Sequence, residues 1–210
     1  MAQVLGIDEA GRGAVLGPLV VAGVLVPEEE LPLLVDLGAK DSKAVPRDRR
    51  RGLVRGIARR FPVRAVVIPA REVDSHTLTE LELTAAAELI ASLSPDRVVL
   101  DAPVAPAAIP AFLSELSQRS GHSVAFLSAY PKADRTHPAA AAASLAAKVI
   151  RDAYVLFLRR RYGDFGWGYP GEDKVVAFLK DWLASHGSLP PICRTRWRSV
   201  GRLLQEELFL

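Results

Sequence analysis

The sequence has very little sulfur: its 210 residues include one cysteine, Cys193, and one methionine, Met1. A single cysteine cannot form a disulfide within the chain, and it excludes a metal site built from several cysteines. The N-terminus also lacks a charged segment followed by a long apolar one, so we expect no signal peptide. Both absences are typical of a protein of the reducing cytoplasm.

Long apolar runs are missing as well. No run reaches the roughly 18 residues that a membrane-spanning helix needs, and the alanine-rich segment from Ala139 to Ala147 is short and ends at Lys148. Hydrophobic residues nevertheless make up 50% of the chain, which argues against disorder. We expect one well-packed domain without membrane contact, with at most a small appendage.

Several motifs of nucleotide-binding and nucleophilic enzymes are absent. Gly11, Gly13 and Gly17 do not fit G-x-G-x-x-G, and the chain has no G-K-[ST], which argues against a dinucleotide fingerprint there and against a P-loop. No G-x-S-x-G elbow surrounds Ser42, Ser75 or Ser144. The four histidines show no metal-ligand spacing. Any catalytic chemistry must therefore come from other side chains.

The formal net charge is only +3, but the basic residues are clustered. Seven arginines fall between Arg47 and Arg60, and Arg159-Arg160-Arg161 forms a second group. Such local basic density suits a polyanionic partner. The alternative is a solvated helix face, which is the more common origin of a charge run.

The pattern of apolar residues predicts a mixed α/β sheet flanked by helices, because helices and strands alternate after an initial hairpin. Residues 28–45 look irregular. We expect a core over residues 1–155 and a helical extension over 156–210 that packs on it. The expected strands are 3–8, 19–26, 63–69, 97–101 and 124–127. The expected helices are 47–61, one starting after Asp74 or Thr77 and running to Leu93, 107–119, 138–162, 172–185 and 196–208.

Four acidic residues stand out by their position. Asp8 and Glu9 follow the first strand, Asp101 follows a later one, and Asp134 lies between the last strand and the longest helix. Strand ends gather at one edge of a sheet, where neighbouring carboxylates repel unless a cation is shared. Oxygen ligands suit Mg²⁺ or Mn²⁺, and two such ions would serve phosphodiester hydrolysis. The alternative is that these residues are turns or helix caps, Asp134 above all.

Two glycine-containing segments could contact a ligand. Gly11 and Gly13 permit close backbone approach, with Arg12 between them as a phosphate partner, although a plain hairpin turn explains them equally well. Tyr169 lies in the loop Phe165–Pro170 and could stack on a sugar or base. For Phe165 and Trp167 we expect a role in core packing.

Seven blocks of the sequence closely resemble those of type 2 ribonucleases H, in the family's order over nearly the whole chain. The last two blocks are close to archaeal members of that family. The blocks are G-I-D-E-A-G-R-G at residues 6–13, K-D-S-K at 40–43, Asp101 after its strand, K-A-D at 132–134, A-A-A-S-L-A-A-K-V-I-R-D at 141–152, and G-D-F-G-W-G-Y-P at 163–170 together with P-P-I through Trp197. The departures, at Ala44-Val45, His137 and Leu145, remove no acidic residue.

The resemblance implies an RNase H-like fold with a C-terminal helical extension. It implies cleavage of RNA in RNA/DNA hybrids and at single ribonucleotides in duplex DNA, as in ribonucleotide excision repair. Asp8, Glu9, Asp101 and Asp134 would be the catalytic set, binding two Mg²⁺ or Mn²⁺ ions. Since water and not the 2′-hydroxyl attacks phosphorus, the ends would be 3′-hydroxyl and 5′-phosphate. Substrate would be bound by Gly11-Arg12-Gly13, which reads the 2′-hydroxyl, by Tyr169 at the RNA–DNA junction, and by Lys43 and Lys148.

Two rival functions remain open at this point. A DNA-junction resolvase would share the fold and the carboxylates but would not need ribose, and a non-catalytic module would only bind hybrids. We expect a monomer. The C-terminal segment Gln205–Leu210 contains a glutamine and a late aromatic residue, as in a sliding-clamp peptide, but helical packing explains these residues as well.

Overall fold

The computed structural model describes residues 1–38 and 45–205. They form two compact units. The first, here called the sheet unit, comprises Met1–Ala10, Val20–Val66 and Thr79–Ile150, and the second unit comprises Gly11–Leu19, Val67–Leu78 and Arg151–Leu210. The expected division into residues 1–155 and 156–210 remains a prediction.

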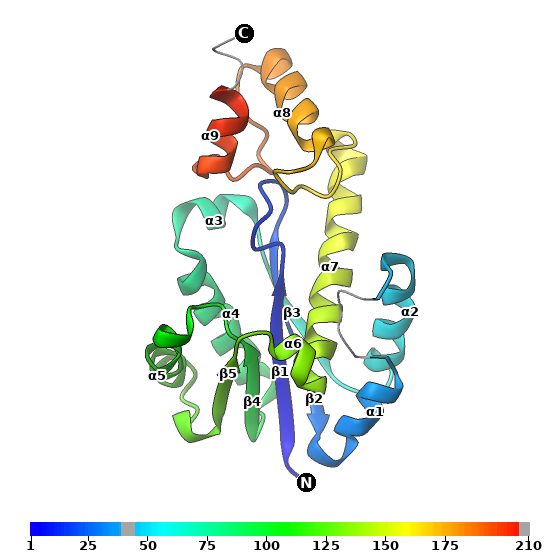
Figure 1. The fold of residues 1–210 in the computed structure, drawn as a ribbon, viewed down its shortest axis with the longest axis vertical. Helices are drawn as coiled ribbons and strands as arrows, with labels where there is room; N and C mark the ends of the chain where they lie inside the picture. The colour runs from blue at the N-terminus through cyan, green and yellow to red at the C-terminus, as the bar shows by residue number, and fades with distance from the viewer. Residues whose placement is uncertain (39–44, 206–210) are drawn as a thin grey trace. The chain divides into compact units, whose positions relative to one another are not determined.

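The strands form one mixed sheet, as predicted (Figure 1). Its order is β3-β2-β1-β4-β5. Strand β1 pairs antiparallel with β2, with Ile7 opposite Gly23, and parallel with β4, with Ile7 opposite Leu100. Strands β4 and β5 are also parallel. The strand bounds are Gln3–Ala10 (β1), Leu19–Pro27 (β2), Val63–Ile68 (β3), Arg97–Asp101 (β4) and Leu127–Tyr130 (β5).

Helices flank this sheet. Among the described residues, no helix is both long and apolar enough to cross a lipid bilayer. The α-helices are Leu31–Asp36 (α1), Arg47–Ala58 (α2), Ala70–Ser75 (α3), Leu78–Leu93 (α4), Ile109–Ser120 (α5), Ala133–Thr136 (α6), Pro138–Tyr162 (α7), Asp173–His186 (α8) and Arg198–Gln205 (α9). Short 3-10 turns cover Glu28–Glu30, Pro106–Ala108 and Val124–Phe126.

The start of α7 packs closely against the central strand. A Cβ added to Gly6 in β1 would overlap the backbone of Ala139, so glycine in the strand and alanine in the helix let the two backbones touch. Ala139–Ala143 are all buried. This tight packing fixes α7 next to the acidic residues of β1.

Several expected element bounds were wrong. Residues 28–36 are a 3-10 turn and a helix instead of an irregular segment, because Pro32 starts the helix and Leu34 is buried beneath it. The last strand lies at Leu127–Tyr130, three residues later than predicted, after a 3-10 turn. Strand β1 continues to Ala10.

The later β1 end changes where two acidic residues lie. Asp8 and Glu9 are inside the strand and pair with Ala22 and Val21 of β2, so they do not follow it as predicted. Helix α4 begins at Leu78. Thr77, and not Asp74, therefore precedes it.

Candidate active site

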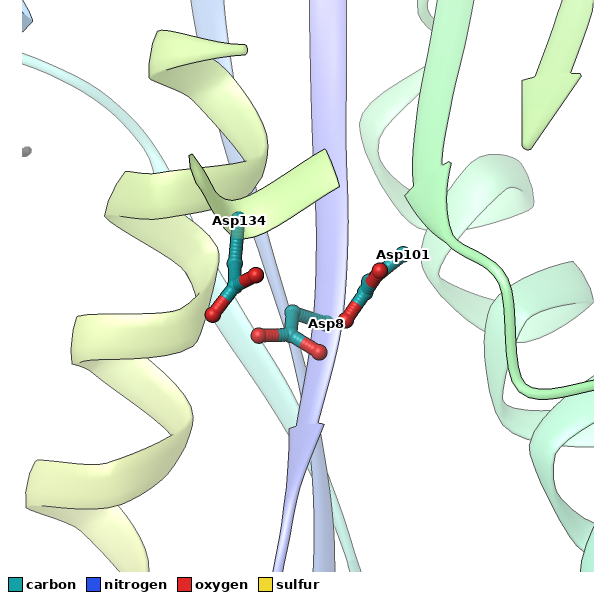
Figure 2. A group of neighbouring side chains, drawn as sticks. All are labelled: Asp8, Asp101 and Asp134. Atoms are coloured by element: carbon teal, nitrogen blue, oxygen red, sulfur yellow. The ribbon is translucent and has the colours of Figure 1, made fainter. Parts of the chain in front are cut away.

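Three of the four predicted acidic residues converge in the sheet unit. Asp8 comes from β1, Asp101 from the last position of β4 and Asp134 from α6 (Figure 2). One carboxylate oxygen from each lies within 4.8 Å of the other two. Parallel pairing of β1 with β4 places Asp8 and Asp101 on neighbouring strands, so the sheet itself brings these two carboxylates together.

A tight turn after β5 brings in the third acid. Lys132 has a left-handed backbone, with φ of 63°, and α6 begins immediately after it. The Ala133 N–H donates to Asp101 Oδ1 at 2.9 Å, which ties the start of α6 to the end of β4. Asp134 is buried, with 2% of its surface exposed. A turn or cap residue would normally face solvent, so its position favours a ligand.

Helix α7 supplies side chains that orient Asp8. The Ser144 side chain hydrogen-bonds to Asp8, and Lys148 Nζ donates to Ser144 Oγ at 2.7 Å. Asp8 Oδ1 also accepts the Glu9 N–H at 2.7 Å. Lys148 is thus linked to the acidic group through Ser144, and its predicted contact with substrate remains a prediction.

The electrostatics of this group fit a divalent cation. Burial raises the pKa of Asp8 well above its ordinary value, and the charges of Glu9 and Asp101 raise it further. Asp134 Oδ1 is buried and accepts no hydrogen bond within the described part of the chain. Buried, mutually repelling oxygens of this kind are costly unless a cation compensates them. Mg²⁺ and Mn²⁺ prefer such oxygen ligands.

Glu9 and one residue missed by the sequence reasoning lie beside this group. Glu9 is half-buried and falls outside the three-carboxylate cluster. It lines a small cavity together with Asp8, Asp101 and Glu82 of α4. Glu82 is buried. It shares an i, i+4, i+7 stripe with Ala86 and Leu89, and an acid in that apolar stripe was the signal that could have found it.

The predicted ribose-reading residues lie in the second unit. Residues 11–17, here called the glycine loop, begin at Gly11, whose φ is +89°. A Cβ there would overlap the Arg151 side chain, whereas a Cβ at Gly13 would meet no atom within 4 Å. Internal packing therefore explains Gly11. Only Gly13 leaves room beside the backbone that a ligand could occupy.

The aromatic loop lies in the same unit. Tyr169 is 37% exposed, and the Arg151 guanidinium lies 4.9 Å from its ring centroid. Phe165 is buried in the core of the unit and Trp167 packs against that core, as predicted. Lys43 lies outside the described residues.

A mixed five-stranded sheet with three converging carboxylates defines an RNase H-like protein whose site suits metal-dependent phosphodiester hydrolysis. The family model for ribonuclease HII matches residues 5–200. The chain therefore belongs to the ribonuclease HII family and is a ribonuclease H enzyme.

Relatives and solved structures agree with this assignment. Ribonuclease HII of Pyrococcus furiosus is 36% identical over 203 residues, covering 94% of this chain and 89% of the relative. The crystal structure of ribonuclease H2 from Pyrococcus horikoshii OT3 matches with a TM-score of 0.88 at 31% identity, covering 97% of this chain and 98% of that one. The ribonuclease HII of a PCNA complex from Archaeoglobus fulgidus matches with a TM-score of 0.84 at 36% identity, covering 93% and 95%.

Proposed function

We propose that this ribonuclease H is a metal-dependent endonuclease that hydrolyses the RNA strand of RNA/DNA hybrids and cuts at ribonucleotides embedded in duplex DNA. The observation that carries the proposal is the convergence of Asp8, Asp101 and Asp134 within 4.8 Å. Ribonucleotide excision repair in the cytoplasm, by a monomer, is the role we infer for it.

Asp8, Asp101 and Asp134 would hold the divalent ions, with Glu9 as a fourth ligand. Bound Mg²⁺ or Mn²⁺ supplies Lewis-acid stabilisation of charge at the phosphorus and lowers the pKa of a water. The chain's own part is orientation: the Ala133 N–H holds Asp101, and Ser144 holds Asp8. Since water attacks in place of the 2′-hydroxyl, cleavage leaves a 3′-hydroxyl and a 5′-phosphate.

Substrate recognition would use different groups. We infer that Gly11-Arg12-Gly13 reads the ribose 2′-hydroxyl through its backbone and that Tyr169 packs on the sugar at the RNA–DNA junction. The open space at Gly13 supports the first contact. The exposed ring of Tyr169 supports the second. Lys43 and Lys148 would bind backbone phosphate.

The arginines of α2 would add affinity without reading sequence. Arg51 and Arg55 of that helix and Arg59, which follows its last residue, are exposed, and their spacing of four residues suits a common face. Contacts of this kind release counterions and make binding depend on salt. We expect Arg51→Ala combined with Arg55→Ala to flatten the salt dependence of hybrid binding.

A sliding-clamp contact is also proposed. The matching ribonuclease HII of Archaeoglobus fulgidus was solved in a complex with PCNA. In this chain the corresponding prediction rests on Gln205–Leu210, of which residues 206–210 lie outside the described part. Loss of clamp binding on deletion of 206–210 would support it.

The experiment that tests the proposed function compares two duplexes that differ by one 2′-hydroxyl. We expect cleavage in Mg²⁺ only of the duplex that contains a single ribonucleotide, with a 5′-phosphate on the downstream product. Equal cleavage of the all-DNA duplex would favour a junction resolvase. Binding without cleavage of any hybrid would favour a non-catalytic module.

A further inference from the structure

Two arginines of the second unit are buried to an extent that is rare for this residue. Arg151 exposes 2% of its surface and Arg194 exposes none. Removing a guanidinium from water is costly unless its N–H groups find acceptors. Both side chains are therefore held there by specific partners.

Arg194 donates to the glycine loop. Its Nη2 contacts the Gly11 carbonyl at 2.8 Å and the Gly17 carbonyl at 3.4 Å, and its Nη1 contacts the Arg12 carbonyl at 3.0 Å. Its own N–H donates to the Val15 carbonyl at 2.9 Å. One residue near the C-terminus therefore holds both ends of a loop near the N-terminus.

Arg151 joins that loop to the aromatic segment. Its guanidinium donates to the carbonyls of Leu16 and Pro18, both at 3.3 Å, and of Trp167 at 3.0 Å. The same guanidinium lies 4.9 Å from the Tyr169 ring centroid. Arg151 thus fixes the glycine loop and the backbone just before Tyr169 together.

The direction of the carbonyls decides the direction of the N–H groups. The described residues contain no cis peptide bond, and in a trans peptide plane the C=O and the next N–H point in opposite directions. The carbonyls of Gly11 and Arg12 point toward the Arg194 guanidinium, from which they accept hydrogen bonds. The N–H groups in the same two peptide planes, those of Arg12 and Gly13, are therefore directed away from Arg194. These are the backbone donors of the turn that would meet a 2′-hydroxyl.

We propose that Arg194 and Arg151 are positioning residues for ribose recognition: Arg194 orients the N–H groups of Arg12 and Gly13, and Arg151 sets the Tyr169 ring. The inference rests on the proposed function. It assigns to two buried arginines a part in selecting a ribose 2′-hydroxyl over deoxyribose.

The charge of Arg194 is kept at neutral pH. Burial, and to a smaller extent the positive charge of Arg151, lower its pKa to about 10. The guanidinium therefore remains protonated and keeps its donors. A lysine in its place would keep the charge, but one ammonium cannot reproduce the planar fork that reaches three carbonyls.

Arg194→Lys and Arg151→Lys test the inference, with Arg71→Lys, an exposed arginine of the same unit, as the matched control. In an Asp8→Asn background, we expect Arg194→Lys to remove most of the preference for a one-ribonucleotide duplex over all-DNA. All-DNA affinity should stay unchanged. In otherwise wild-type protein, misplacing the donors should lower kcat on that duplex by about 100-fold.

Arg151→Lys should act differently. Because Arg151 faces Tyr169, we expect a larger loss at a single embedded ribonucleotide than within a long RNA strand. Equal losses on the two substrates would overturn its assignment to the junction.

Hydrogen exchange at residues 11–17 is the readout that does not depend on activity. We expect faster exchange there in Arg194→Lys and unchanged exchange in β1 and β4. Normal exchange together with a normal ribose preference would overturn the inference. If the unsubstituted protein fails to cut at a ribonucleotide, the proposed function fails, and the exchange result still decides whether Arg194 positions the loop.

A second variant is available if Arg194→Lys does not fold. Asp74 accepts from the N–H and hydroxyl of Thr195 at 2.7 and 2.8 Å, which fixes the backbone next to Arg194. Asp74→Asn should shift exchange and ribose preference in the same direction by a smaller factor. No shift in either measurement would count against the inference.

Discussion

The two units bury charge in opposite ways. In the sheet unit, three carboxylates approach one another, and one of them, Asp134, keeps an oxygen without a hydrogen bond inside the described part of the chain. In the second unit, two guanidiniums are buried, but backbone carbonyls surround them. Arg194 Nε also lacks a hydrogen-bond partner in the described part of the chain, but both Nη atoms of Arg194 reach carbonyls. The acidic group therefore needs an added cation, whereas the chain itself supplies most of the partners of the basic pair.

This difference distinguishes the acidic residues, which form a candidate catalytic site, from the buried arginines, which hold the backbone of the second unit in place. Removing an acid relieves repulsion in the folded protein, and sites of this kind trade stability for function. Removing an arginine takes a donor away from buried backbone carbonyls, which destabilises the fold. We therefore expect the unfolding free energy to rise when an acid of the sheet unit is removed and to fall when a buried arginine of the second unit is removed.

The largest expected effect is on activity. Asp8→Asn should reduce cleavage by about 10⁴-fold or more, while hybrid binding is retained because phosphate contacts supply much of it. In metal-free buffer the same variant should be more stable than the unsubstituted protein at neutral pH. Single-turnover cleavage and thermal unfolding of one preparation measure both. If Asp8→Asn lowers the stability in metal-free buffer, the three carboxylates do not destabilise the folded protein, and the two units do not differ in this way.

The next effect is on the second unit. Arg194→Met removes the donors to three carbonyls, so we expect a loss of about 2–4 kcal/mol of unfolding free energy. Denaturant titration against Arg71→Met measures it. A neutral Arg194→Met would show that water or another donor satisfies the glycine loop, and the two units would then not differ as argued.

Between pH 5 and pH 8, metal and pH should act chiefly on the sheet unit. Because the pKa of Asp8 is raised in the folded protein, its contribution favours folding below the ordinary value of 3.8 and is lost as the pH rises through the raised value. A bound cation reverses this loss, by about 2.7 kcal/mol at a hundred times its dissociation constant.

Unfolding in Mg²⁺ and in EDTA from pH 5 to pH 8 checks this expectation. The metal-dependent gain should grow with pH and should shrink in Asp8→Asn. A gain of the same size at every pH would contradict the assignment of Asp8 to the metal site.

The smallest stability effect is expected at Gly13. Open space surrounds a Cβ there, so Gly13→Ala should change the unfolding free energy by no more than about 0.5 kcal/mol while weakening ribonucleotide cleavage. Gly11→Ala is the contrast, because its φ of +89° and its contact with Arg151 leave no room. If Gly13→Ala leaves cleavage intact, the turn does not read ribose.

Local chemistry made much of the fold predictable. Helix α7 was predicted with its observed bounds, 138–162, because Pro138 suits a helix start and Gly163, with φ of +102°, suits its end. The predicted position of β5 was wrong because the alternating apolar residues Val124 and Phe126 resemble a strand, although they lie exposed in a 3-10 turn. Local patterns do not reveal which apolar residues find a partner.

The site was predictable to the same degree. Acids near strand ends drew attention to Asp8, Asp101 and Asp134, whose carboxylates do converge, while their role as a catalytic set stays a prediction. Glu82 and the buried arginines were missed because charged residues usually face solvent. The proposed role of Arg194 depends on its hydrogen bond to the Gly11 carbonyl, and Gly11 lies 183 residues earlier in the sequence. Long-range partners of this kind leave no periodic pattern.

That distance has a consequence for how the protein is made. Gly11 of the glycine loop is translated 183 residues before Arg194. Asp8, Asp101 and Asp134 are all translated at least sixty residues earlier than Arg194. A chain released early would carry the acidic residues without the arginine that shapes the glycine loop. Translation of Arg194 would thus be the step that lets the glycine loop take its shape.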